Sequence, residues 1–410
     1  MRLLLLLTVM LFICNDTYGQ SDSGKPGTKD SLANAKERKL IISVLPFVSS
    51  GPTTGFLYGV SASLAKYFGP TATTHLSTAA FGAIRTAKNQ TFFTFKSTVF
   101  TKDDDWYLMG DWRYLNHDIP NWGLGTGPSS QKLASNGFNY SDDMWSAPIS
   151  ANQQIAYTHI RFHETVMKRI KRSAFFVGAG YRLDIHKDIN DQILDLNAQP
   201  PVITSHYAYS VSNGFDPERY ALSSISIDAV YDTRDNSANA YTGRYANISE
   251  RISPELLGSS KSSSSLWLEY RDYLSLSAAN PRHLIAFWTY GSFLTSGTPG
   301  YLDLAASGFD QYSRSARPYT QGRFRGQNLV YAETEYRFPI VNRWGGVLFL
   351  NGSTASNKDA NIRLFDYVDP GYGLGLRWMV NRKSRTNVTI EYGFGKYGAT
   401  ALVFNLGETF

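Results

Sequence analysis

Hydrophobic and polar residues alternate in short stretches along most of the chain. Within residues 330–340 the even-numbered positions are mostly apolar, whereas the odd-numbered positions include Glu333, Glu335 and Arg337. Similar stretches, in which glycine and charged residues back an apolar row, are 175–185, 371–380 and 387–395. Alternate residues of a β-strand face opposite sides, so this pattern predicts strands with one apolar and one polar face. Strands of about ten residues with this pattern are typical of a transmembrane β-barrel, although a soluble β-sandwich also contains them.

The pattern predicts about sixteen such strands. They are expected to begin near residues 40, 55, 73, 90, 105, 153, 173, 220, 240, 264, 283, 327, 345, 371, 386 and 399. An even number of strands returns both ends of the sheet to one side of the membrane, which is the periplasm in single-chain bacterial barrels.

The predicted connections separate by length. The even-numbered ones are short turns, whereas several odd-numbered ones are long, at residues 117–152, 188–219, 253–263, 295–326 and 353–370. Outer-membrane barrels have short turns on one side and long loops on the other, and a soluble sandwich has no reason to separate them. The expected fold class is therefore all-β, a single transmembrane antiparallel β-barrel. Its apolar rows face lipid, and Glu333, Glu335 and Arg337 face the lumen.

The N-terminal residues predict export. Residues 1–19 contain one basic residue, an apolar run and small or polar residues, which is the pattern of a secretory signal peptide. Residues 20–38 are polar and read as a flexible periplasmic tether, and residues 39–410 form the barrel. The only cysteine, Cys14, falls in the signal peptide, so no disulfide is expected in the mature chain.

The composition supports many strands and no enzyme. The chain has 26 Tyr, 24 Phe, 8 Trp and 34 Gly, and only 18% of its residues are charged. It contains no GxSxG motif, no P-loop and no cysteine-based metal site, so we expect no catalysis, cofactor or metal. The net charge of +6 is too weakly patterned to suggest nucleic acid.

Three polar motifs have structural interpretations. The segment 159–164 (HIRFHE) spaces two histidines as a helical metal pair would, but in a strand both face the lumen, which favours a polar lining over a metal site. Asp232, Arg234 and Asp235 lie at a strand end, which favours structural ion pairs over an acid–base cluster. The basic turn 168–172 either contacts acidic lipid headgroups or is solvated.

Five segments together resemble the BamA/TamA-type family of outer-membrane assembly barrels (bacterial surface antigen barrels), and most closely its compact members from Bacteroidetes. They follow the family's order within residues 40–410. They are PNWGLGTG at 120–127, YDTRDNSANAYTGRYANIS at 231–249, RPYTQGRFRGQN at 317–328, EYRFPI at 335–340 and FNLGETF at 404–410. The second segment supplies the family strand motif, which here is Asp232, Arg234, Asp235, Asn236 and Gly243.

In that family the loop between strands eleven and twelve folds into the lumen. Its Arg-Gly-aromatic tip pairs with a glutamate on strand twelve and an aspartate on strand thirteen. The resemblance assigns the tip to Arg317, Pro318 and Tyr319, the glutamate to Glu335 and the strand-thirteen position to Asn351. Two departures follow, because Pro replaces Gly and a neutral amide replaces an acid. A charge-assisted fork between Arg317 and Glu335 is still expected.

The remaining residues of the loop motif are Gly322, Arg323 and Arg325. In one interpretation they belong to a loop that folds into the lumen and pairs with the charged residues of strand twelve. In the other, Arg323 and Arg325 simply fill a water-filled lumen.

The last segment predicts a final strand that ends on an aromatic residue. Phe404, Leu406 and Phe410 share one parity, so all three are expected to face lipid. The resemblance implies that they form the C-terminal targeting signal of an outer-membrane barrel, and an ordinary edge strand ending in Phe is the alternative.

The resemblance implies a function in inserting or translocating outer-membrane proteins of a Gram-negative bacterium. In the family the first and last strands, here 40–49 and 399–410, part toward lipid and offer an edge to a client strand. The short tether leaves no room for a periplasmic POTRA domain, so a passive pore or a structural membrane platform is the alternative. The expected partners are outer-membrane lipid and either client proteins or a periplasmic protein. A monomer is expected, and a fused enzyme is the least favoured hypothesis.

Overall fold

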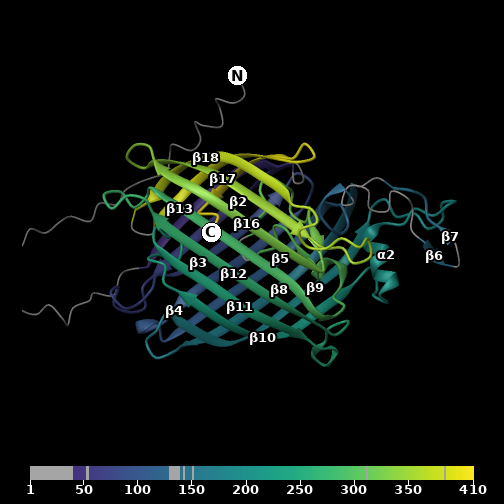
Figure 1. Cartoon of the computed structure of the whole chain (residues 1–410), viewed down its shortest axis with the longest axis horizontal. Coiled ribbons are helices and arrows are strands. Elements are labelled where there is room, and N and C mark those ends of the chain that lie inside the picture. The colour runs from purple at the N-terminus through teal and green to yellow at the C-terminus, as the bar shows by residue number, and fades with distance from the viewer. Residues whose placement is uncertain are drawn as a thin grey trace, which may run out of the picture. The chain divides into compact units, whose positions relative to one another are not determined.

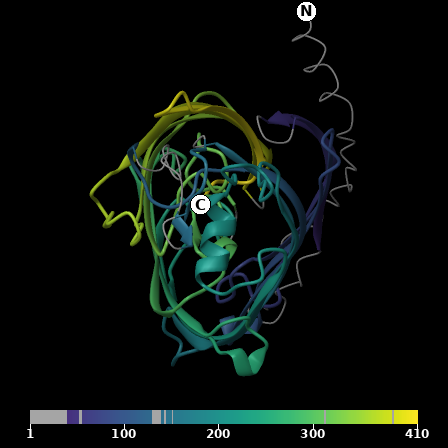
Figure 2. The same ribbon diagram turned by 90° about the vertical axis from the view of Figure 1, so that its right-hand side faces the viewer.

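The barrel is built from sixteen antiparallel strands in one sheet. The computed structural model describes residues 40–51, 55–128, 139–141, 144–149, 152–310, 313–382 and 385–410. The predicted signal peptide and tether (1–38) lie outside these residues, and their assignment stays a prediction. Figure 1 shows the strands running obliquely beside one another, and Figure 2 shows them arranged as a ring, with α2 over one end.

The sheet strands follow the order of the chain. They are β1 (Ile41–Gly51), β2 (Gly55–Lys66), β3 (Ser77–Thr86), β4 (Thr91–Phe100), β5 (Trp106–Asn121), β8 (Gln153–Arg169), β9 (Phe175–Asp191), β10 (Tyr220–Asp232), β11 (Gly243–Ser253), β12 (Ser263–Ser275), β13 (Leu284–Gly297), β16 (Asn328–Pro339), β17 (Trp344–Ala355), β18 (Asp369–Asn381), β19 (Thr386–Gly395) and β20 (Thr400–Leu406). Within the described residues, the connections contain two short two-stranded ladders and one α-helix. These are β6 (Asn139–Ser141) with β7 (Met144–Trp145), β14 (Ala305–Ala306) with β15 (Arg325–Gly326), and α2 (Ser205–Ser212).

The predicted number and order of strands are confirmed. The largest error in a predicted start is at β3, which was expected near residue 73 and begins at Ser77. Three strands are longer than expected, because β5 has 16 residues and β8 and β9 have 17 each. Their ends continue to pair with one another beyond the predicted boundaries, as in Asn121↔Gln153 and Ile155↔Asp191. The long loops therefore start later than the alternation alone suggested.

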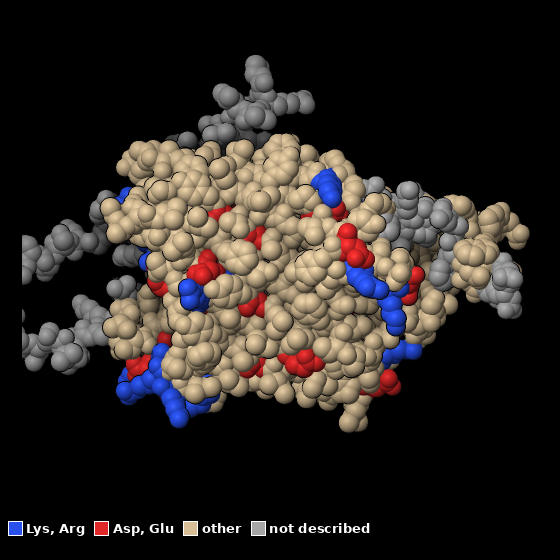
Figure 3. All heavy atoms as spheres, viewed as in Figure 1, with Lys and Arg blue, Asp and Glu red and all other residues tan. Residues whose placement is uncertain are grey.

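The two faces of the strands have the predicted characters. On β16, Tyr331, Glu333 and Glu335 are at most 1% exposed, whereas Tyr336 is 37% exposed. Leu350, on the outward face of β17, is 60% exposed. Residues without charge form most of the face in Figure 3. In the described residues no helix is long and apolar enough to cross a membrane. The apolar row of each strand therefore faces outward and the charged row faces the lumen, as the alternation predicted.

Side chains and inward loops pack the interior of the barrel. One cluster surrounds Trp288 and Tyr331 and includes residues of the loop before β16. A second, near the long loops, contains Tyr157, Tyr220 and Tyr301, and a third, near the short turns, includes aromatic residues of β4, β5 and β9. Packing of this kind fixes inward segments against the wall, because buried aromatic rings contribute large contact areas.

The sheet has one interrupted junction. β1 and β20 are the two ends of the strand order, and no hydrogen-bonded ladder joins them in the described part of the chain. Cα atoms of the two strands nevertheless approach within 8 Å. β1 has 11 residues and β20 only 7. We call this junction the seam, and on each side of it one strand edge has no strand partner.

The barrel should be heat-modifiable on an electrophoretic gel. Every junction of the sheet except the seam is a hydrogen-bonded ladder, so the folded barrel should stay compact in mild detergent and unfold slowly. The unboiled protein should migrate faster than the boiled protein, and a sample unfolded in concentrated urea should match the boiled one. Identical mobility before and after boiling would contradict the barrel.

Candidate functional site in the lumen

The loop between β13 and β16 (residues 298–327) turns into the lumen. The short ladder between β14 and β15 closes the base of this loop, through the pairs Ala305↔Gly326 and Ala306↔Arg325. Several of its side chains are buried: Arg317 is 6%, Phe324 0% and Arg325 2% exposed. The structure therefore places the tip of this loop inside the barrel, where a charged side chain loses water and needs other polar partners.

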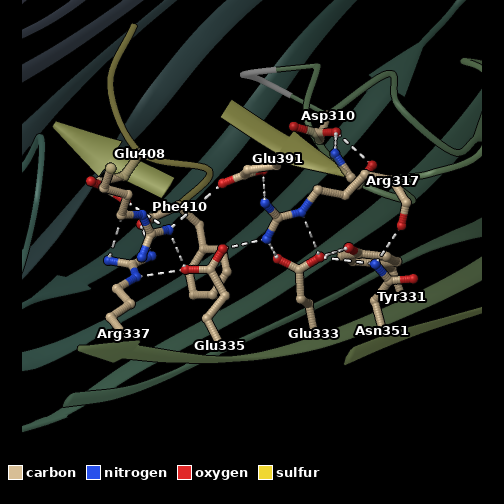
Figure 4. Close-up of polar contacts among 12 residues, drawn as sticks. Asp310, Arg317, Tyr331, Glu333, Glu335, Arg337, Asn351, Glu391, Glu408 and Phe410 are labelled. Atoms are coloured by element: carbon tan, nitrogen blue, oxygen red, sulfur yellow. Dashed lines mark hydrogen bonds and ion pairs between the residues drawn. The ribbon is translucent and has the colours of Figure 1, made fainter. Parts of the chain in front are cut away.

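Arg317 lies among three carboxylates that come from two strands (Figure 4). Its Nη2 donates to Glu333 Oε1 at 2.6 Å and its Nε to Glu333 Oε2 at 3.3 Å. The same Nη2 also donates to Glu335, and Nη1 donates to Glu391 on β19. Burial lowers the pKa of Arg317, but the three carboxylates outweigh burial and raise the pKa above its usual value. The guanidinium therefore stays charged and holds the loop to β16 and β19.

A second group of charges shares Glu335 with this first one. Arg337 Nε donates to Glu335 Oε2 at 2.5 Å, and Arg377 Nη2 donates to the same oxygen at 2.9 Å. Arg377 also lies 2.9 Å from Glu408, in the segment after β20. The combined lumenal network places three guanidinium groups beside four carboxylates, and each of these groups is at most 6% exposed. Buried charges are tolerated only when they are paired in this way.

Asn351 makes different contacts from those expected of an acid at its position. Its Nδ2 donates to the backbone oxygen of Arg317 at 2.6 Å and to Glu333 Oε2 at 3.0 Å. It therefore orients the loop and one carboxylate but neutralises no charge. The expected contact between Arg317 and Glu335 is present, but the two-pronged fork goes to Glu333.

The sequence did not identify Glu391, Arg377 or Glu408 as members of the network. Glu391 and Arg377 each lie on the polar parity of a strand that the alternation had recognised, so both were placed on the lumen face. The parity gave no information on which of the many lumenal groups meet. The carboxylate that strand thirteen lacks is supplied by Glu391 from strand fifteen, β19.

Glycines on β18 and β19 make room for the loop tip. A Cβ atom at Gly371 would lie 2.7 Å from Pro318 Cδ, and one at Gly393 would lie 2.9 Å from Pro318 Cβ. At Gly395 the nearest atom would be Tyr319 Cζ at 2.6 Å. Real Cβ contacts are not this short, so larger residues at these positions exclude the tip. The Tyr319 hydroxyl donates to the backbone oxygen of Pro370 at 2.6 Å, which fixes the tip against β18.

The remaining arginines of the loop motif contact backbone oxygens and aromatic rings. Arg325 Nη1 donates to the backbone oxygens of Tyr301 and Leu302 at 3.1 and 3.0 Å. The Arg323 guanidinium lies 4.9 Å from the ring centres of both Trp122 and Tyr397. Of the two interpretations, a packed inward loop describes these contacts better than a water-filled lumen. Gly322 adopts a positive φ of 77°, where a side chain would be strained.

The strand motif forms a turn held by ion pairs. Arg234 makes a fork to Asp232, at 2.9 and 2.6 Å, and Asp235 pairs with Arg385 at 2.6 Å. Asn236 Oδ1 accepts two backbone N–H groups of the turn at 2.8 and 2.9 Å. Gly243 adopts a φ of 99° and closes against backbone. The structure thus places the motif at the connection between β10 and β11, whose conformation these contacts hold.

The two histidines of segment 159–164 line the lumen. Nε2 of His159 and Nε2 of His163 each lie 2.8 Å from an oxygen of Asp184 on β9. In the ranges that the structure describes, no group of His, Cys, Asp and Glu side chains has an arrangement that could hold a metal ion. The pair is therefore engaged in bonds between neighbouring strands.

The prediction that Phe410 faces lipid is wrong. Gly407 has a φ of 99°, which ends β20 and turns the following residues inward. Phe410 is 5% exposed and lies 5.2 Å from the ring of Trp288, and its backbone oxygen accepts from Arg337 Nη2 at 3.2 Å. Parity counts hold only while the chain stays extended, and the turn at Gly407 breaks the count. Phe404 is 39% exposed and does face outward, and Leu406 is the last residue of β20.

Replacing Arg317 with alanine should release the loop tip. Removing one member of a buried ionic group leaves its partners uncompensated, at a cost of roughly 3 kcal/mol or more. Proteolysis within residues 298–327 should therefore become faster in Arg317→Ala, and Arg317→Lys should restore little, because an ammonium cannot form the fork. Arg244→Ala is the matched control, since Arg244 pairs with Asp272 at an exposed site. Equal cleavage of Arg317→Ala and the native protein would show that these charges do not hold the loop.

Filling the space at Gly393 should release the same loop without changing any charge. Gly393→Val places carbon atoms where the Pro318 ring lies, so the tip should dissociate from β19 and the loop should become protease-sensitive. Adding Pro318→Gly removes the ring and should restore much of the protection. A Gly393→Val protein that resists proteolysis as well as the native one would contradict this fit.

Comparison with known proteins agrees with this architecture. Residues 135–410 match the family described as the Omp85 superfamily domain. No curated protein matches the chain. Among solved structures, BamA from Haemophilus ducreyi lacking POTRA domains 1–3 is 15% identical, with a TM-score of 0.53 over 90% of this chain and 69% of that one. CdiB from Acinetobacter baumannii is 11% identical, with a TM-score of 0.50 over 90% of this chain and 60% of that one.

These identities show a shared fold and no more. The family match is of a different kind, because it covers residues 135–410, which include the loop, the lumenal network and the last strand. On this ground, the sixteen-stranded barrel with its inward loop belongs to the Omp85 superfamily.

Proposed function

We propose that this protein is an outer-membrane barrel that inserts or translocates other outer-membrane proteins through the seam between β1 and β20. Membership of the Omp85 superfamily supports the location in the outer membrane. The observation that carries the proposal is the seam itself, where the strand order ends in two edges and not in a closed ladder.

A strand edge can recognise another strand through its backbone alone. Unpaired N–H and C=O groups along an edge accept an added strand, and the pockets and faces beside it select the side chains. The outward residues of β1 include Ile42, Val44 and Val48, which are 58%, 56% and 48% exposed. A client strand with the same alternation would therefore pair with the edge of β1 and present its apolar face to lipid.

The lumenal network connects the strands next to the seam on their inner side. It connects the inward loop to β16 and β19 through Arg317, and it connects Arg377 on β18 to Glu408 after β20. These contacts lie entirely on the side of the seam formed by the last strands. We infer that the last strands and the loop form a rigid unit, and that the seam opens by movement of β1 relative to this unit.

The proposed partners of the barrel are the membrane lipid, a client protein and a periplasmic protein. Lipid of the outer membrane covers the apolar outward face, and the client is an unfolded barrel protein or a secreted segment. A periplasmic partner would deliver that client. We infer that one copy of the chain suffices, because both edges of the seam belong to the same sheet.

Covalent closure of the seam should abolish the proposed activity. Paired cysteines, one in Ile41–Gly51 and one in Thr400–Leu406, should form a disulfide that holds the seam shut. Cells that depend on the oxidised variant should lose outer-membrane barrel proteins broadly, as measured by proteomics of the outer membrane, and a reductant should reverse the loss. Cysteines at Ser43 and Ser63 are the control, because β1 and β2 are already paired there.

Three outcomes would contradict the proposal. If depletion of the protein leaves the set of outer-membrane proteins unchanged, the assembly function is wrong. If depletion reduces that set but the closed seam does not, clients use another route. A large, steady conductance in planar bilayers would instead indicate the passive pore, since a barrel filled by an inward loop should conduct weakly.

A further inference from the structure

A shallow, open hollow lies on the outward side of β3, β4 and β5, near the connection between β3 and β4. It is lined by Arg85, Asn89, Thr91, Phe93, Tyr114 and Asn116. The strand register places these residues side by side, with Arg85 opposite Thr91 and Phe93 opposite Tyr114. Phe92, between Thr91 and Phe93, packs against the lumenal His117, so its two neighbours face outward. The hollow therefore opens toward the membrane and not toward the lumen.

The position along β5 puts the hollow at the level of lipid headgroups. Trp106, at the end with the short turns, is 41% exposed, and Tyr114, eight residues later, is 42% exposed. Eight residues of a tilted strand rise about 20 Å, which is close to the height of the apolar band of an outer-membrane barrel. Barrels of this kind carry aromatic residues at both borders of that band. Arg85 and Asn116 lie just past Tyr114, on the side of the long loops.

Arg85 is an exposed cation without an acidic partner. Its Nη2 donates to Asn89 Oδ1 at 3.2 Å, and its Nη1 donates to the Thr91 hydroxyl. Across the residues with described positions, no carboxylate lies within 4.0 Å of it. Arg244, which is also exposed, pairs with Asp272 at 3.2 Å. Two neutral side chains thus accept from the Arg85 guanidinium and leave its positive charge uncompensated.

We propose that this hollow binds the phosphorylated headgroup of a lipid in the outer leaflet. A phosphate accepts two parallel hydrogen bonds from a guanidinium, and the amides of Asn89 and Asn116 supply further donors. The exposed rings of Phe93 and Tyr114 continue from the hollow into the apolar band, together with Trp112, which is 44% exposed. An acyl chain attached to the headgroup would lie along these rings.

We choose a lipid over a soluble anion because the Arg85 cation lies next to an exposed apolar surface, and a lipid can contact both. A soluble phosphate compound would gain nothing from the aromatic rings, whereas an anionic lipid uses both. The assignment to the outer leaflet rests on the proposed outer-membrane location, in which the long loops face outside the cell. Lipid A, a phosphorylated and multiply acylated glycolipid of Gram-negative outer leaflets, has the required chemistry.

Native mass spectrometry of the detergent-solubilised protein tests the site. The probes are bis-phosphorylated lipid A and the same lipid with its phosphates removed. The native protein should bind the phosphorylated form at least tenfold more tightly. Arg85→Gln should abolish this preference, and Tyr114→Ala should weaken both lipids. Arg244→Gln should bind as the native protein does, and an unchanged shift in gel mobility on boiling would show that each variant is folded.

Three results would overturn the proposal. Equal binding of the two lipids to the native protein would exclude phosphate recognition. Unchanged preference in Arg85→Gln would place the recognition elsewhere. Full competition by inorganic phosphate at equal concentration would identify a site for the free anion. None of these measurements involves a client protein, so they stand apart from the test of the seam.

Discussion

Burial of the Arg317 guanidinium is the constraint from which the arrangement of the lumen follows. A charge removed from water must be met by opposite charges, and the loop tip brings this one to a point where Glu333, Glu335 and Glu391 converge. Glu335 in turn lies against Arg337 and Arg377. Each buried charge thus needs a further partner of opposite sign. The last of these partners is Glu408, in the segment after β20, which pairs with Arg377. The loop, three strands and the end of the sheet are thereby held by one set of charges.

Space is the second condition for this arrangement. The charges converge only because the tip approaches the wall closely, and it does so where β18 and β19 carry glycine on the lumen face. Gly371 and Gly393 lie against the Pro318 ring, and Gly395 lies against Tyr319. Glycine usually weakens a strand, because it offers no side chain for packing. Here the loop supplies the missing packing, so the wall and the loop each stabilise the other.

The sequence predicted the features that depend only on neighbouring residues along a strand, which are the strands themselves and the direction in which their side chains face. Alternation placed Glu333 and Glu335 on the lumen face correctly, and it located sixteen strands. It did not predict which lumenal groups meet, because Arg317 and Glu391 are 74 positions apart and meet across the interior. It also failed for Phe410, because the turn at Gly407 leaves no trace in the parity. The hollow beside Arg85 was not predicted either, since it arises from three strands in register.

The carboxylate that Asn351 lacks has a wider consequence for how such barrels are compared. β17 and β19 both border the space that holds the loop tip, so the acid on β19 reaches the arginine whose backbone oxygen accepts from Asn351 on β17. The position on β17 can therefore be neutral while the guanidinium still has carboxylate partners on β16 and β19. A search that demands an acid at one column would class this chain as having lost the ion pair, although Arg317 has three acidic partners. A comparison of such lumens therefore has to count the carboxylates around the guanidinium, and not only the residue at one position.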